Sequence, residues 1–204
     1  MTATIKINIK DINSQWIEEL KEKYPDQNME IKIIPSSKTE LLDENTFWDI
    51  INLLDWTKIE DDAILAPAIE QLASFPVHYI YLFQDVLSEK LFQLDAKKYA
   101  LHIGEDAWKE GQYFSVDHFL YARCCVVANG KDVFEKVIEK PETMPKDITF
   151  EALLNIASKA YELKTGEEFN YMPQYNYETY SNQKGWDNQT TPQRLKYRTK
   201  YGCT

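Results

Sequence analysis

The chain has 204 residues, a length typical of one main domain with a short accessory segment. Hydrophobic residues make up 44% of it and aromatic residues 13%, which excludes a disordered chain because this is enough apolar surface to order a globular fold. The 23 basic and 33 acidic side chains give a net charge of −10, which argues against nucleic-acid or anionic-membrane binding and favours a basic protein partner.

The sequence predicts a cytoplasmic protein that does not bind or cross a membrane. No apolar run reaches the roughly 20 residues of a membrane-spanning helix. The first residues, Met-Thr-Ala-Thr-Ile-Lys, lack the basic and apolar stretches of a signal peptide. Cys124 and Cys125 are adjacent and cannot easily form an unstrained disulfide, so we expect these two and Cys203 to be free thiols in a reducing compartment.

Residues 1–35 are predicted to form a strand-helix-strand unit. Residues 4–9 and 29–34 alternate apolar and polar side chains and are rich in isoleucine, a pattern typical of strands. Ser14 is suited to begin a helix between them, and Pro25 to end it.

A two-stranded sheet is marginal by itself and exposes both of its edges. Two completions remain open. A second copy of the chain would give a homodimer through the N-terminal sheet edge, whereas the alternating residues 174–180 would add a strand from the same chain.

Residues 46–183 are predicted to form a helical domain. Thr46 and Asp49 have the spacing of a capping box at the start of its first helix. A second helix is expected from Ala66, with Pro67 in its first turn, and a third from Ser74.

The helical pattern continues to Gly166. Asp95 is predicted to cap a fourth helix and Ser115 a fifth that ends at Gly130, followed by a short helix over 131–140. The last strong helix is expected from Phe150, capped by Thr149, to Gly166. Together these elements predict an α+β fold, with a mostly helical body and a small N-terminal strand-helix-strand unit.

Residues 184–204 differ in charge from the rest of the chain. They carry five basic side chains against Asp187 alone. Because chain ends are usually loose and this one is rich in Gln, Asn and Thr, we expect a basic, flexible tail.

The helical body resembles the bacterial domain-of-unknown-function family DUF 4240 over about residues 47–186. The resemblance rests on motifs spread along this range: Phe47-Trp48, Leu72, Pro76, Phe83, Phe119, Asn129-Gly130-Lys131, Phe134-Glu135, Pro141-Glu142-Thr143, Glu151-Ala152-Leu153-Leu154, Tyr161 and Thr165-Gly166-Glu167-Glu168. Many members carry a Gly-Gly-Cys-Ser-Asp-Asp-like stretch, of which only Ser115 and Asp117 remain here. The resemblance implies a fold but no activity. Residues 1–35 also look like a segment of small antitoxin-like proteins.

The candidate catalytic residues are Asp117, His118 and Arg123, which fall on the helix predicted after Ser115. A histidine near a carboxylate can shuttle protons, and a cysteine such as Cys124 near an arginine can be a reactive thiolate. The structural alternative is that Asp117 favours the helix dipole and the cysteines fill the core.

The sequence predicts neither a metal site nor a cofactor. The three histidines have no second ligand at the short spacing of a zinc site. The six glycines form no phosphate-binding loop.

The candidate binding residues are the aromatic group Tyr175, Tyr177, Tyr180 and Trp186. Such rings bury a large area on a protein partner, although packing onto the helical core is the structural alternative. We therefore predict a protein-binding or regulatory module of the immunity or antitoxin type. The alternative function is an uncharacterised enzyme with a site near Asp117, His118 and Arg123, and the sequence alone does not decide whether the protein is an enzyme.

Overall fold

The computed structural model describes residues 14–25 and 43–186. The chain divides into two compact units, Met1–Thr39 and Glu40–Thr204. In the first unit the structure describes α1 (Ser14–Lys23), which confirms the helix predicted before Pro25. The predicted strands 4–9 and 29–34 lie outside the described residues.

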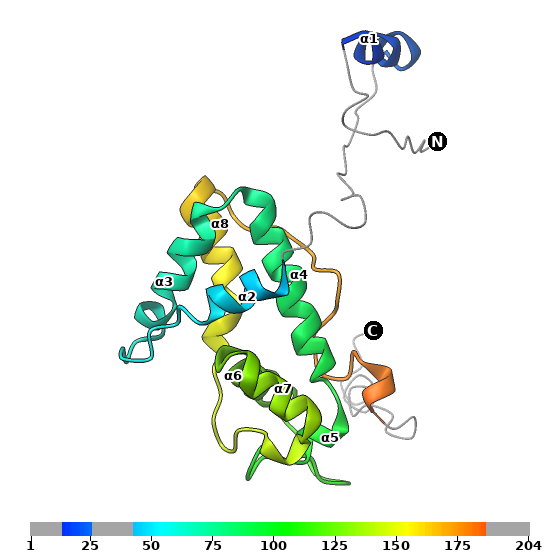
Figure 1. Cartoon of the computed structure of the whole chain (residues 1–204). Helices are drawn as coiled ribbons and strands as arrows, with labels where there is room; N and C mark the ends of the chain where they lie inside the picture. The colour runs from blue at the N-terminus through cyan, green and yellow to red at the C-terminus, as the bar shows by residue number, and fades with distance from the viewer. Residues whose placement is uncertain (1–13, 26–42, 187–204) are drawn as a thin grey trace, which may run out of the picture. The chain divides into compact units, whose positions relative to one another are not determined.

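The second unit is mostly helical, as the sequence predicted (Figure 1). Its α-helices are α2 (Glu44–Ile51), α3 (Asp61–Ser74), α4 (Val77–Gln93), α5 (Lys97–Ala100), α6 (Val116–Ala128), α7 (Lys131–Glu139) and α8 (Ile156–Thr165). Short 3-10 helices are η2 (Pro141–Thr143), η3 (Glu151–Asn155) and η4 (Gln183–Gly185). None of the helices described combines the length and apolar character needed to cross a bilayer.

The core lies where α3, α4 and α8 pack together, with α2 packed against α3 and α4 (Figure 1). Ala68 of α3 and Ala157 and Ala160 of α8 are buried, and small side chains of this kind let two helices approach closely. The α6 helix is buried along most of its length and packs against α4, α7 and η3. This packing fixes α3 beside α8 and α6 beside α4.

The α+β prediction is wrong for the described part of the chain, where no strand occurs. Residues 174–180 in particular form bends and a turn rather than the expected strand. The backbone N–H of Gln174 donates to the Asp85 carboxylate and that of Tyr180 to the Asp95 carboxylate. These backbone N–H groups bind carboxylates of the helical body instead of a neighbouring strand. The alternating apolar and polar side chains of residues 174–180 therefore do not indicate a strand.

Several predicted helix starts are also corrected. The α4 helix begins at Val77 rather than Ser74, and α8 begins at Ile156, after the 3-10 helix η3, rather than at Phe150.

The carboxylate of Asp43, rather than a capping box at Thr46, accepts a hydrogen bond from the first turn of α2. The α3 helix begins at Asp61, five residues before the predicted start, and Pro67 lies inside it. The acidic side chains of the first turn favour this earlier start. Proline lacks a backbone N–H, so Pro67 removes one hydrogen bond from the helix without ending it.

Two other predicted boundaries are confirmed. Ser115 caps α6, since its Oγ accepts a hydrogen bond from the backbone N–H of His118. Gly166 ends α8 with a φ of 72°, a left-handed conformation that favours glycine.

Candidate functional site

The structure separates the candidate catalytic residues. Asp117 and His118 lie in the first turn of α6, where Asp117 is exposed and His118 is partly buried. The Nε2 atom of His118 lies 3.7 Å from an Asp106 carboxylate oxygen. Arg123 lies about one and a half turns further along the helix and is 0% exposed. Asp117 and His118 therefore share a surface that the Arg123 side chain does not reach.

The Arg123 guanidinium joins three parts of the fold. Its Nη1 donates to the carbonyl oxygens of Leu91 and Tyr177, and its Nη2 donates to Thr179 Oγ1, all at 2.9 Å. It also lies 4.8 Å from the centre of the Phe119 ring. Burial lowers the pKa of Arg123 from its ordinary value. This arginine therefore connects α4, α6 and residues 167–186, which we call the C-terminal segment.

Asp95 is the second buried charge at this junction. It is 0% exposed, and its carboxylate accepts hydrogen bonds from Tyr180 N, Asn182 N and Trp186 Nε1 at 3.1, 2.8 and 2.9 Å. The helix-capping role predicted for Asp95 is wrong, because α5 begins after Ala96 without a side-chain cap. The carboxylate instead holds the end of the C-terminal segment.

Asp85 provides a third point of attachment. One of its carboxylate oxygens accepts from Tyr171 Oη and the other from Gln174 N, both at 2.8 Å. The Tyr171 ring stacks on Tyr81 with 4.7 Å between ring centres. Burial and the neighbouring Asp85 carboxylate raise the pKa of Tyr171 above its ordinary value. The C-terminal segment is thus fixed by Asp85, Asp95 and Arg123.

The candidate binding aromatics lie within this segment and pack on the helical body. The Tyr175 ring lies 5.3 Å from Phe92, and the Tyr180 ring lies 4.4 Å from Trp186. Trp186 is 6% exposed, and burial raises the pKa values of Tyr177 and Tyr180. The structure therefore places these aromatic residues next to Arg123, although in the sequence they belonged to two separate candidate sites.

The two adjacent cysteines are buried thiols. Burial raises the pKa of Cys124 to about 12, so this side chain is protonated at neutral pH and is not a thiolate nucleophile. Within residues 14–25 and 43–186, no group of three or more His, Cys, Asp or Glu side chains is placed to hold a metal ion.

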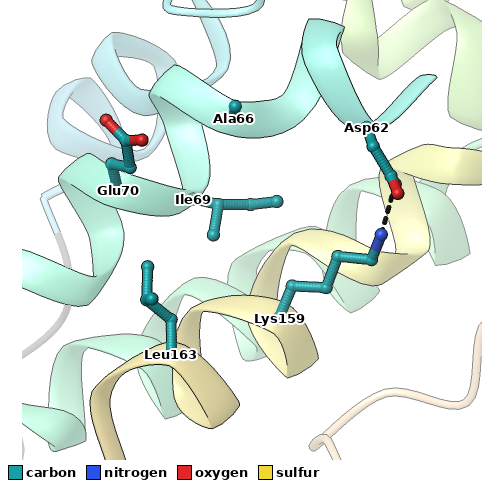
Figure 2. A pocket seen from close by; sticks show the side chains of 6 residues that line it. All are labelled: Asp62, Ala66, Ile69, Glu70, Lys159 and Leu163. Carbon is teal, nitrogen blue, oxygen red and sulfur yellow. Dashed lines mark hydrogen bonds and ion pairs between the residues drawn. The ribbon is translucent and has the colours of Figure 1, made fainter. Parts of the chain in front are cut away.

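A hollow of about 300 Å³ opens between α3 and α8 (Figure 2). Its α3 side follows from the helical spacing of Asp62, Ala66 and Ile69, which repeat at four and three residues. On α8 a four-residue step aligns Lys159 with Leu163. The full lining consists of Asp62, Ala66, Ile69, Glu70, Lys159 and Leu163.

The hollow combines an apolar floor with charged ends. Ile69 lies at its centre, and Leu163 beside it is 62% exposed (Figure 2). At one end Lys159 forms an ion pair with Asp62. At the other end the Glu70 carboxylate points away from Lys159 and makes no ion pair within the part of the chain that the structure describes. A hollow that combines an exposed leucine with acidic residues in its lining is suited to an amphipathic partner.

The loop that leads into α3 adds exposed apolar and acidic groups. Ile59 is 92% exposed, and Trp56 is 51% exposed while its ring lies 5.1 Å from Phe150. Glu60 and Asp61 follow directly and are exposed. The acidic and apolar surface therefore extends beyond the hollow into this loop.

Sequence reasoning missed the hollow because it started the second helix at Ala66. With that start, Asp62 lies outside the helix and the stripe through Ile69 is lost. The acidic pair Asp61 and Asp62, which favours a helix N-terminus, was the available signal. The contact between α3 and α8 could not be read from one sequence, because the two helices are about 90 residues apart in the chain.

Comparison with known proteins gives one result. The sequence model of the family described as "Protein of unknown function (DUF4240)" matches residues 42–163. These residues include every side chain that lines the hollow, whereas the C-terminal segment lies beyond them. No curated protein and no solved structure matches the chain.

Proposed function

The chain belongs to the DUF4240 family of proteins of unknown function, and we propose that it is a cytoplasmic protein-binding or regulatory module of the immunity or antitoxin type. Its partner in this proposal is a basic protein, which the acidic surface covers. The observation that carries the proposal is the hollow between α3 and α8, whose lining combines the exposed Leu163 with the acidic residues Asp62 and Glu70. The net charge of −10 also favours association with a basic partner.

A single substitution separates this binding function from the fold. Leu163 is 62% exposed, so Leu163→Lys removes an apolar contact and adds a repulsive charge while leaving the core of α8 intact. Ile148→Lys is the matched control, because Ile148 is 58% exposed and lies outside the hollow. Both variants introduce the same lysine and change the net charge equally.

The test is capture of the tagged wild type and both variants from host lysate at low salt, followed by native mass spectrometry. We expect a stoichiometric basic protein with the wild type and Ile148→Lys, and at least about a tenfold loss with Leu163→Lys. Far-ultraviolet circular dichroism checks that all three chains remain folded. The proposal is wrong if no partner is captured, or if all three chains retain the same partner.

The pair formed by His118 and Asp106 supports a second candidate function, an uncharacterised enzyme with a site at Asp117 and His118 on the surface of α6, from which the buried Arg123 is separated. The 3.7 Å separation of His118 from Asp106 is longer than a hydrogen bond, so proton transfer through this pair requires the two side chains to move closer when a substrate binds. Asp117→Ala and His118→Ala test it, since both residues lie at the surface of α6. If both variants keep the wild-type melting temperature but lose the cellular phenotype, the enzyme hypothesis is supported. If the phenotype is unchanged, the enzyme hypothesis is rejected.

A further inference from the structure

The charged ends of the hollow set a distance along α3. Asp62 and Glu70 are eight residues apart in one helix, which corresponds to about 12 Å at roughly 1.5 Å per residue. Ala66 and Ile69 lie between these ends, and Leu163 of α8 lies across from them (Figure 2). A ligand helix that lies along α3 therefore has to place its two polar residues about 12 Å apart along its axis, with an apolar residue between them.

We propose that the hollow binds an amphipathic helix of the partner, which carries basic side chains seven or eight residues apart and an apolar side chain midway between them. This inference rests on the proposed protein-binding function and names the chemistry of the partner. Seven or eight helical residues span about 10.5 to 12 Å, which matches the rise along the α3 axis between Asp62 and Glu70. The apolar side chain would then lie over Ile69 and Leu163.

The surroundings favour a helix over an extended segment. Both walls of the hollow are α-helices, whose backbone N–H and C=O groups are already bonded within each helix. An extended segment would find no strand edge to pair with and would leave its own backbone groups unpaired against the apolar floor. A helix satisfies these groups internally and presents one apolar stripe.

Charge decides between a basic and an acidic helix. Asp62 is exposed and pairs with Lys159, while Glu70 at the other end makes no ion pair among the described residues. Glu60 and Asp61 add two exposed carboxylates at the Asp62 end. Four carboxylates therefore lie along this stretch against two ammonium groups, that of Lys159 and that of Lys164, which donates to the Ala73 carbonyl oxygen at the Glu70 end. The stretch keeps a net negative charge, to which basic side chains of an incoming helix would be complementary.

Synthetic peptides test the spacing directly. The first peptide has two lysines eight residues apart with a leucine midway, in a helix-forming background of alanine and glutamine. The second has the same composition with the lysines four residues apart, and the third has glutamate in place of lysine. Each fluorescently labelled peptide is titrated with the full-length chain, and binding is followed by fluorescence anisotropy at low salt.

We expect the first peptide to bind at least about tenfold more tightly than the other two. Glu70→Gln should weaken that peptide alone by about threefold to tenfold, and Leu163→Lys by more than about tenfold, with Ile148→Lys unchanged. Equal binding of the first two peptides, no binding of the first at millimolar concentration, or no effect of Glu70→Gln would overturn the inference.

Two further outcomes assign the hollow to a different occupant and also overturn the inference. Tighter peptide binding by a chain that ends at residue 186 would identify its own basic residues 187–204 as the occupant. A dimer that Leu163→Lys dissociates in sedimentation experiments would identify a second copy. A third outcome is that Leu163→Lys abolishes capture of the lysate partner while the peptides bind equally at both lysine spacings. In that case the proposed protein-binding function is supported, and the inference that the partner binds as a helix is refuted.

Discussion

Replacing Asp95 with alanine should detach the end of the C-terminal segment. The carboxylate is completely buried and accepts hydrogen bonds from Tyr180 N, Asn182 N and Trp186 Nε1. Alanine accepts none of them, so three donors lose their partner at once. The buried Arg123 also loses a nearby negative charge, because Asp95 is among the groups that favour its charged form.

The expected loss of stability follows from these contacts. A buried donor left without an acceptor costs about 1–3 kcal/mol. The three losses do not add, because the segment can move away and expose its donors to water. We therefore expect the free energy of unfolding to fall by about 3 kcal/mol. For a chain of this size, each 1 kcal/mol lowers the melting temperature by about 2–4 °C, so the decrease should be about 6–12 °C.

Differential scanning calorimetry and urea unfolding measure this loss, and amide hydrogen exchange at Tyr180 and Asn182 locates it. Asp117→Ala is the matched control, since Asp117 is exposed on the nearby α6 helix and its replacement should change stability by no more than about 0.5 kcal/mol. A melting temperature for Asp95→Ala within about 1 °C of the wild type would refute the reasoning, as would equal losses in both variants.

Three further outcomes follow from the same region. Arg123→Met should lower the free energy of unfolding in urea by about 2–4 kcal/mol, because two carbonyl oxygens and a hydroxyl lose their buried donor; an unchanged midpoint would contradict this. Gly185→Ala should lower the melting temperature measured by calorimetry, because an added Cβ would lie 2.6 Å from the Asp95 carbonyl oxygen. The pKa of Cys124 is raised from 9.0 to about 12, so its contribution to stability is complete below pH 9 and is lost between pH 9 and 12. Urea unfolding across this range should therefore show a steeper alkaline loss for the wild type than for Cys124→Ala.

Local sequence signals predicted several boundaries of the second unit. Ser115 and Gly166 act within one helical turn of their own positions, by accepting a hydrogen bond and by adopting a positive φ. Pro67 misled the prediction because proline is usual in a first turn, yet here the acidic residues before it extend α3 to Asp61. Local rules failed where two of them competed at one helix end.

The C-terminal segment shows a different limit. Tyr175, Tyr177 and Tyr180 look like a strand in sequence, but Asp95 and Arg123 bind the backbone around these residues. These partners lie more than 50 residues away, and no alternation of side chains reports them. The α3 and α8 helices are also far apart in the chain, so the hollow depends on a contact that a single sequence does not reveal.

Detaching the C-terminal segment should leave the hollow able to bind. Its lining belongs to α3 and α8, whose contact rests on buried residues such as Leu65, Ala68 and Ala157, and it shares no residue with the contacts of Asp95. Substitutions without shared partners are usually independent. Below its melting temperature, Asp95→Ala should therefore bind the helix-spaced peptide within about twofold of the wild type. A tenfold loss would show that the segment supports α8, and the binding surface would then include both.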